Sequence, residues 1–275
     1  MRLNIRHETA YRYATPASRA IEVLHLVPRG HNGQYIAAWR IDVDRDCRLD
    51  QSTDAFGNLM HEFTLDGPIE ELTIVAEGSV ETIDTAGVLN GQVERFPPVL
   101  YLRDTALTVS DALIRDFARE IAGRAGNNRL TLMHAIMEAM RERMRFDVDA
   151  TNTGTTAIEA FALGQGVCQD FAHVFIAACR HLGIPARYTS GYLLAAGGGG
   201  DQSAGHAWAE ALIEELGWVG FDPANGVCPT DSYVRLAVGL DYLGAAPVRG
   251  LIFGGGEESL SVRIAIHPDA RSTGG

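Results

Sequence analysis

One run of sequence, Phe171 to Leu182, constrains the fold more than any other because it is apolar almost all round. A helix without a polar face has to be enclosed by the other elements of its domain. Gly183 supplies a C-terminal turn for such a helix, and Pro185 forbids its continuation. We therefore expect a helix at the centre of one domain, with the rest of that domain packed around it.

The segments around this run favour helices before it and strands after it. Apolar residues recur at helical spacing in 110–121 and 133–144, and a threonine can cap a short helix at 155–163. Helices followed by an antiparallel sheet predict an α+β fold for this part of the chain. The β-rich runs that follow the central helix are 186–194, 206–213, 218–221 and 260–266.

The first third of the chain differs, since short β-rich runs alternate there with turn signals. The runs lie at 21–27, 36–43 and 72–81. Several short strands joined by turns predict an antiparallel β-sandwich. The composition of the sequence then changes at 87–98, a stretch rich in Gly and Pro. We therefore place a domain boundary near residue 100, with a β-rich domain at 1–100 and a second domain at 101–275.

The composition excludes several classes of protein. The 275 residues carry 23 Lys and Arg against 35 Asp and Glu, a net charge of −12 that disfavours binding to nucleic acid. No apolar run reaches the length of a membrane span, and the first residues lack the apolar centre of a secretion signal. We therefore expect a cytoplasmic protein without membrane contact. Four irregularly spaced cysteines disfavour a disulfide framework or a zinc site, and we predict neither metal nor cofactor.

Cys168 stands where a glycine-containing loop meets the start of the central helix. Free N–H groups and the positive end of the helix dipole both stabilise a thiolate at such a position. A helix start and a neighbouring imidazolium are the settings that most favour a reactive cysteine. A lone cysteine is otherwise a small buried packing residue. The interpretation of Cys168 therefore depends on its partners.

Two segments downstream supply candidate partners. Residues 205–211 alternate like a strand, which places His206 and Trp208 on one face, and the glycine-rich loop 197–204 before them is expected to form a rim of the active site. A second short strand ends in Asp222. Two adjacent antiparallel strands would bring Asp222 beside His206. A carboxylate in that place fixes the tautomer and orientation of the imidazole.

Several segments, in order, resemble the bacterial transglutaminase-like superfamily. The resemblance implies that Cys168 is the nucleophile, His206 the general base and acid, and Asp222 the orienting carboxylate. It also implies a papain-like α+β core, preceded by the N-terminal β domain that these bacterial proteins carry. The segments are Gly166–His173, Gly183–Tyr188 with Ser190–Tyr192, Gly205–Trp208, Gly217–Gly226, and Tyr233–Gly239 with Asp241–Tyr242.

The sequence departs from the animal transglutaminases in two respects. Those enzymes stabilise the oxyanion with a tryptophan upstream of the cysteine, and they bind calcium. None of Trp39, Trp208 and Trp218 stands in a matching position, and no acidic loop has calcium-ligand spacing. The Cys168 N–H is then one oxyanion donor. The candidates for further oxyanion or substrate contacts are Gln165, Gln169, Tyr192 and Trp208.

These inferences predict a cysteine-dependent hydrolase, a peptidase or amidase that cleaves a peptide or isopeptide amide through an acyl-thioester on Cys168. The missing tryptophan and calcium loop favour hydrolysis over acyl transfer to an amine by a transglutaminase or N-acyltransferase. A different alternative is a non-catalytic scaffold that binds a protein partner. The expected partner is a peptide or protein substrate, and the resemblance further implies an association with a peptide-ligating enzyme system. The oligomeric state stays open.

Overall fold

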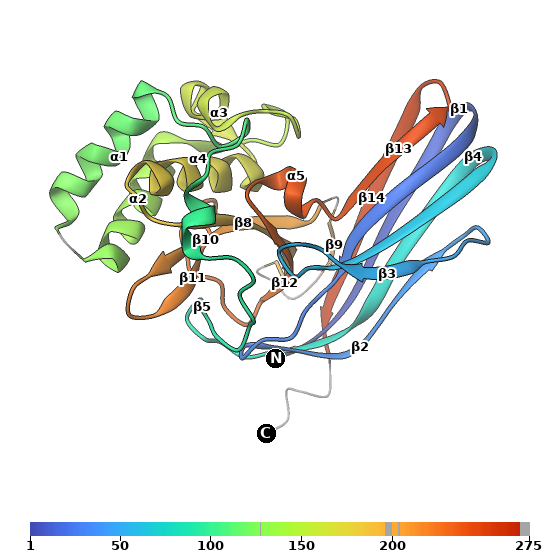
Figure 1. Ribbon diagram of the computed structural model, residues 1–275, viewed down its shortest axis with the longest axis horizontal. Helices are drawn as coiled ribbons and strands as arrows, with labels where there is room; N and C mark the ends of the chain where they lie inside the picture. The colour runs from blue at the N-terminus through green and yellow to red at the C-terminus, as the bar shows by residue number, and fades with distance from the viewer. Residues whose placement is uncertain (127, 196–199, 203, 270–275) are drawn as a thin grey trace.

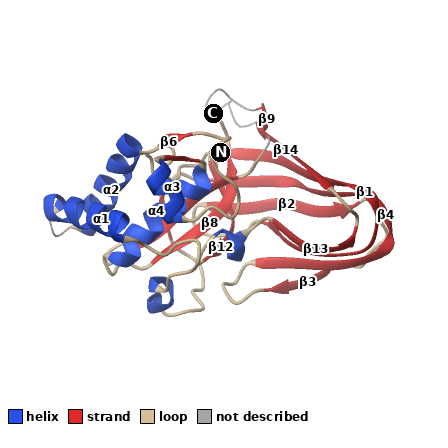
Figure 2. Ribbon diagram, turned by 90° about the horizontal axis from the view of Figure 1, so that it is seen from above, coloured by secondary structure: helices blue, strands red, loops and turns tan. Residues whose placement is uncertain are grey.

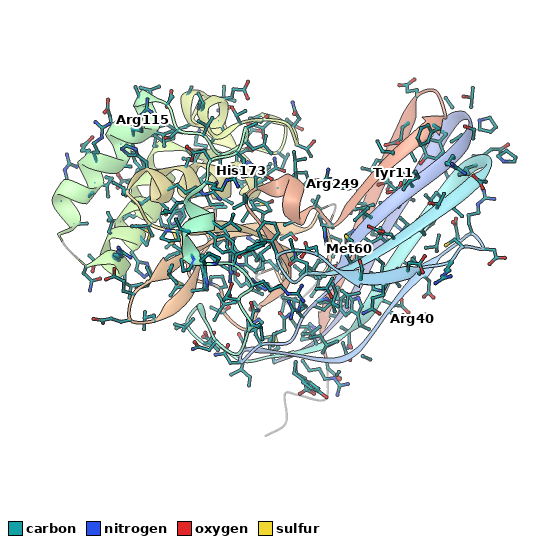
Figure 3. All side chains as sticks on the ribbon, in the orientation of Figure 1. Tyr11, Arg40, Met60, Arg115, His173 and Arg249 are labelled. Carbon is teal, nitrogen blue, oxygen red and sulfur yellow. The ribbon has the colours of Figure 1, made fainter. Side chains whose placement is uncertain are left out.

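The computed structural model describes residues 1–126, 128–195, 200–202 and 204–269. The helices α1 to α4 gather on one side of the molecule, and long strands form the other side (Figure 1). Side chains fill both parts, with His173 inside the helical part and Tyr11 among the long strands (Figure 3). The protein is an α+β protein with antiparallel main sheets, which confirms the predicted fold class.

The first sheet has seven strands and is built on two long ones, β1 (Arg2–Val27) and β4 (Leu59–Thr82). Both run through two facing layers of a β-sandwich. The first half of β1 pairs with β14, and its second half pairs with β13. The order is β2-β4-β1-β14-β9, with β13 beside β1 and β3 beside β4. The other strands are β2 (Gln34–Val43), β3 (Asp50–Thr53), β9 (Gly200–Gln202), β13 (Val248–Gly254) and β14 (Glu258–Pro268).

A change of phase in β1 explains how one strand serves both layers. Buried side chains are odd-numbered from Leu3 to Ala17 and, apart from His25, even-numbered from Ala20 to Leu26. The pairing of β1 with β4 shifts register between Arg12 and Ala17 and again before Arg19. An irregularity of this kind bends a strand and re-aims its side chains. The apolar residues nearest the bend, from Tyr11 to Ala17 before it and from Ala20 to Leu26 after it, therefore face one shared core.

The second sheet has five strands in the order β12-β8-β10-β11-β5. Ala207, Ala209 and Ala211 share one face of β10 and belong to the same core as α4. Their small side chains let the helix approach the sheet closely. The strands are β5 (Val88–Leu89), β8 (Ala186–Leu193), β10 (His206–Ile213), β11 (Gly217–Phe221) and β12 (Tyr233–Gly239).

The helix α4 (Cys168–His181) is the predicted central helix. Every side chain from Gln169 to Arg180 is buried, which confirms the interpretation of its apolar sequence. The helices α1 to α4 lie together on one side of β8 and β12 when the molecule is seen from above (Figure 2). The other helices are η1 (Pro98–Leu102), α1 (Ala112–Ala125), α2 (Arg129–Arg143), α3 (Ala157–Leu163) and α5 (Tyr242–Ala245).

The end of the chain returns to the first sheet. Residues 260–266 form a strand as predicted, but this strand, β14, pairs with β1 rather than extending the sheet beside α4. In the other direction, β5 lies before residue 100 and pairs with β11. Both sheets therefore take strands from both sides of the proposed boundary. The division into domains at 1–100 and 101–275 stays a prediction.

Polar contacts join the two sheets. The Tyr192 hydroxyl, on β8, lies 3.0 Å from His7 Nδ1 on β1. Gln34, on β2, exchanges two hydrogen bonds with the main chain of Arg235 on β12.

Within the described ranges, we find no helix long and apolar enough to cross a membrane.

Candidate active site

Cys168 is the first residue of α4, and a short ladder holds the chain that leads to it. Strand β7 (Gln165–Gly166) pairs in parallel with β6 (Arg145–Phe146), which follows α2. The Arg145 N–H donates to Gly164 O, and the Asp147 N–H donates to Gly166 O. The nucleophile candidate is half-buried. It thus stands at the positive end of a long helix whose entry is fixed by main-chain bonds.

His206 and Asp222 lie on adjacent antiparallel strands. His206 begins β10, and Asp222 directly follows β11, which pairs with β10. The two strands bring His206 Nε2 to 2.6 Å from Asp222 Oδ2. The histidine side chain is 12% exposed and the carboxylate is fully buried. The structure therefore brings these two predicted residues into direct contact.

The Asp222 carboxylate accepts hydrogen bonds from every polar group around it. Besides His206, the donors to Oδ2 are Asn225 Nδ2 at 2.7 Å and the Tyr233 hydroxyl at 2.8 Å. The main-chain N–H groups of Ala224 and Asn225 donate to Oδ1. Burial would raise the pKa of Asp222, but the bond from His206, its charge and the bonds from Asn225 and Tyr233 hold it below the usual range. The site is built for a negative charge.

The His206 ring lies between this carboxylate and the thiol. Burial alone would lower the pKa of His206, but hydrogen bonds to Asp222 and Cys168, with the charges of both, raise it from 6.5 to about 10. Because Nε2 is turned to Asp222, Nδ1 is the nitrogen that serves Cys168. The ring therefore carries a positive charge at neutral pH, next to the sulfur.

Comparisons with known proteins point to one family for both parts of the chain. Residues 115–223 match the model of the transglutaminase-like superfamily, and residues 3–81 match that of the bacterial transglutaminase-like N-terminal region. Together the two models cover well over half of the chain. The chain carries a transglutaminase-like core, preceded by a bacterial transglutaminase-like N-terminal region.

Relatives and a solved structure extend along nearly the whole chain. An uncharacterised protein of Mycobacterium leprae is 29% identical over 96% of this chain and 98% of its own. One from Mycobacterium tuberculosis is 28% identical over 97% and 93%. The crystal structure of a "putative cysteine protease" from Cytophaga hutchinsonii superposes with a TM-score of 0.78, at 22% identity, over 97% of this chain and 90% of that one. This last likeness shows a shared fold.

In this transglutaminase-like protein, Trp208 and Tyr233 support the histidine. The Trp208 ring is 2% exposed, lies 6.2 Å from the His206 ring and meets the Tyr233 ring edge-on at 5.5 Å. Gly191, which pairs with His206 across β8, makes room for them, since a Cβ there would lie 2.5 Å from the Trp208 ring. Trp208 thus packs beside the histidine ring inside the protein and has almost no exposed surface for a substrate to contact.

The other predicted contact residues lie in different places. Gln169 is buried, and its side-chain amide donates to Thr153 O at 3.1 Å, so it is already engaged within the protein. Tyr192 is 1% exposed and packs between the sheets against His7, so it does not line a substrate groove. Gln165, in β7, is half-buried with no side-chain hydrogen bond to Cys168, His206 or Asp222 in the described part of the chain, and its role stays a prediction.

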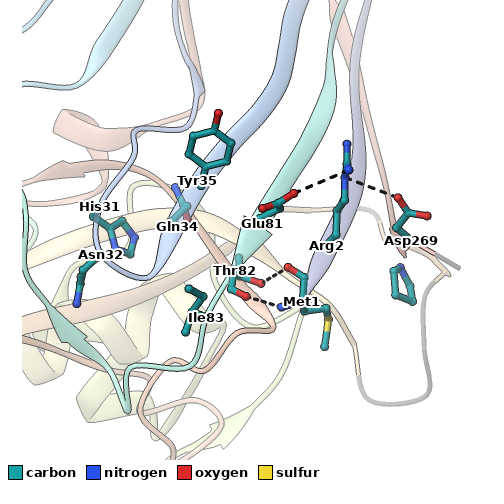
Figure 4. A pocket seen from close by; sticks show the side chains of 11 residues that line it. Met1, Arg2, His31, Asn32, Gln34, Tyr35, Glu81, Thr82, Ile83 and Asp269 are labelled. Carbon is teal, nitrogen blue, oxygen red and sulfur yellow. Dashed lines mark hydrogen bonds and ion pairs between the residues drawn. The ribbon is translucent and has the colours of Figure 1, made fainter. Parts of the chain in front are cut away.

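Residues 197–199 and 203 of the glycine-rich loop, the predicted rim, lie outside the described residues. A hollow of about 830 Å³ lies elsewhere, near the start of β1, with Arg2, Tyr35 and Glu81 in its wall (Figure 4). Among the residues that the structure covers, no three His, Cys, Asp or Glu side chains are grouped to hold a metal ion.

Sequence reasoning missed Asn225 and Tyr233 as partners of Asp222. Asn225 follows Asp222 by three residues in a turn closed by the Gly226 N–H donating to Asp222 O. An Asp-Pro-x-Asn run after a strand is a turn signal that could have indicated a side chain folding back on the aspartate. Tyr233 lies on β12, which is separated from Asp222 by a loop, and the sequence offers no comparable local signal for its contact.

Proposed function

We propose that this protein is a cysteine-dependent hydrolase that cleaves a peptide or isopeptide amide through an acyl-thioester on Cys168. The superfamily and the shared fold support a cysteine-type enzyme. The observation that carries the finer proposal is the His206 ring held between the Asp222 carboxylate and the Cys168 thiol. This arrangement supplies a nucleophile, a proton carrier and an orienting group in one contact chain.

The geometry suits a two-step reaction. In the reacting pair the proton of Cys168 already lies on His206 Nδ1, and the thiolate sulfur forms a bond to the amide carbonyl carbon. The C–N bond then breaks, the amine takes the proton from His206, and an acyl-thioester remains. Water next gives a proton to His206 and adds its oxygen to the thioester carbon. The C–S bond breaks, the acid leaves, and the sulfur is again a thiolate beside the protonated His206. Asp222 stabilises the imidazolium in both steps.

The first test uses a glutamine-containing peptide together with a labelled primary amine. We expect deamidation or cleavage, measured by mass spectrometry, to exceed incorporation of the amine. Incorporation exceeding hydrolysis would show instead that the thioester is passed to amines. The matched control is Cys168→Ala, which should give neither product because it lacks the sulfur.

A second test does not depend on knowing the peptide substrate. The activated ester p-nitrophenyl acetate should acetylate Cys168, with release of p-nitrophenolate in a burst equal to the protein concentration. A peptide map locates the acetyl group. Wild-type protein that gives no burst and no label on Cys168 would refute a catalytic role and favour a scaffold that only binds a partner.

A further inference from the structure

Asp170 folds back over the chain that enters α4. It lies two residues after Cys168, is 1% exposed, and accepts two hydrogen bonds at Oδ2, from the Val167 N–H at 2.8 Å and from Thr151 Oγ1 at 2.6 Å. Gly166 allows this fold, because a Cβ there would lie 2.5 Å from Oδ2. A buried carboxylate with two donors is a firm connection between three parts of the chain.

The first turn of α4 keeps main-chain N–H groups that no side chain of the helix start caps. A helix usually begins with a residue whose side chain accepts from the first free N–H groups, but Val167 has no acceptor in its side chain. The N–H groups of Asp170 and Phe171 donate to Val167 O, at 2.9 and 3.1 Å. The N–H groups of Cys168 and Gln169 have no hydrogen-bond partner among the described residues. Two donors thus stay free beside the sulfur.

The same turn also holds the loop 147–156. Thr151 is bound by Asp170, and Thr153 O accepts from the Gln169 side chain at 3.1 Å. This loop begins where β6 ends, and β6 pairs with β7 just before Cys168. The two residues that follow the nucleophile therefore fix the segment beside it at two points.

We propose that Asp170 is a positioning residue, which holds the first turn of α4 so that the main-chain N–H groups of Cys168 and Gln169 point together at the carbonyl oxygen of a bound substrate. The inference rests on the proposed function, because only acyl chemistry develops a negative charge on that oxygen. Donors set in place before the reaction stabilise such a charge without reorganisation. Asp170 acts through Val167 and Thr151 and touches no reacting atom.

Two reactions of one thiol separate this role from a general structural one. Iodoacetamide alkylates the sulfur by displacing iodide, so no oxyanion forms and only the thiolate matters. With p-nitrophenyl acetate, the sulfur adds to the ester carbonyl and a tetrahedral oxyanion forms before p-nitrophenolate leaves. Oxyanion donors therefore speed the second reaction and not the first. Each rate is measured on the peptide that contains Cys168.

We expect Asp170→Ala to slow acetylation about 100-fold, the size of a lost oxyanion donor. Its alkylation rate should stay within about threefold of the wild type, since the thiolate and His206 are untouched. Thr151→Val keeps the shape of the side chain and removes one bond, so it should slow acetylation about two- to tenfold. Asp170→Asn is the matched rescue, since its amide oxygen can accept both bonds and should keep acetylation near the wild-type rate.

The outcomes distinguish the two proposals. If acetylation and alkylation fall together in Asp170→Ala, or if Thr151→Val acetylates at the wild-type rate, Asp170 does not position the oxyanion donors while the hydrolase proposal stands. If the wild-type protein shows no burst, the proposed function itself fails. Thermal unfolding of each variant checks the fold. If Asp170→Ala is unfolded, the acetylation rate of Thr151→Val tests the role of Asp170 instead.

Discussion

Replacing Asp222 by asparagine is expected to slow acetylation of Cys168 by about 10³- to 10⁴-fold, the loss known for an orienting carboxylate of a triad. The Asp222 carboxylate accepts from five donors, three of them side-chain groups at Oδ2. The asparagine NH₂ would face N–H and O–H groups that now donate to the carboxylate. The neutral amide could also no longer stabilise the charge of the imidazolium. The p-nitrophenolate burst rate measures the effect. Unlike Asp170→Ala, this variant should also lose alkylation, because the thiolate loses its counter-ion.

Tyr233→Phe is the matched control for Asp222. It removes one donor at 2.8 Å and leaves the contact between Asp222 and His206 in place. We expect it to slow acetylation by no more than about tenfold, the value of a single hydrogen bond. Equal losses in Tyr233→Phe and Asp222→Asn would mean that the carboxylate serves the packing of the turn rather than the histidine.

Replacing Glu210 by alanine should lower the free energy of unfolding by about 3–5 kcal/mol, the usual cost of breaking a buried ion pair. Glu210 is fully buried and lies two residues after Trp208. Its oxygens are 2.6 Å from Arg187 Nε and 2.6 Å from Arg235 Nε. Without it, two buried guanidinium groups face each other and the support of β10 behind His206 is lost. Urea unfolding measures the change.

Glu94→Gln provides the comparison for Glu210, because Glu94 binds the same Arg187 from the surface. Its side chain is 36% exposed, and its Oε2 lies 2.7 Å from Arg187 Nη1. We expect a loss of about 1 kcal/mol or less, as for exposed pairs. Equal losses for Glu94→Gln and Glu210→Ala would contradict the importance of burial.

Acid provides a second check on the same cluster. Burial raises the pKa of Glu210, but Arg235 and Arg187 outweigh it and lower the pKa to about 2. A carboxyl group whose folded-state pKa is depressed contributes stability above its unfolded pKa of 4.5 and loses it as the pH falls toward 2. Wild-type protein should therefore lose stability from about pH 4.5 downwards more steeply than Glu210→Ala does.

The central helix and the contact between His206 and Asp222 were predictable because their signals are local. An apolar run bounded by Gly183 and Pro185 needs no partner to be read as a buried helix. The alternation around His206 and the strand before Asp222 set the faces and ends of two neighbouring strands, and the pairing of β10 with β11 agrees with that expectation. The catalytic roles of these residues stay predictions.

The rest depends on pairings between distant segments, which local patterns do not specify. The sequence predicts the strand at 260–266 itself. Its partner β1 lies some 250 residues earlier, so the sequence does not show which sheet the strand joins. Tyr192 alternates like its neighbours, and only the packing of β1 against β8 shows that it meets His7. The roles of Thr151 and Val167 depend on one folded-back carboxylate, that of Asp170.

The central claim is that Cys168 is held as a thiolate by a protonated His206, and the most direct measurement is the rate of Cys168 alkylation by iodoacetamide from pH 5 to 9. With the pKa of His206 near 10, the imidazolium persists throughout this range. The account predicts that Cys168 of the wild type reacts faster than Cys168 of His206→Ala at the lower end of this range, because the imidazolium stabilises the thiolate. A free thiol instead slows about tenfold per pH unit below about 8.5. A wild-type profile that follows this slope, or coincides with that of His206→Ala, would contradict it.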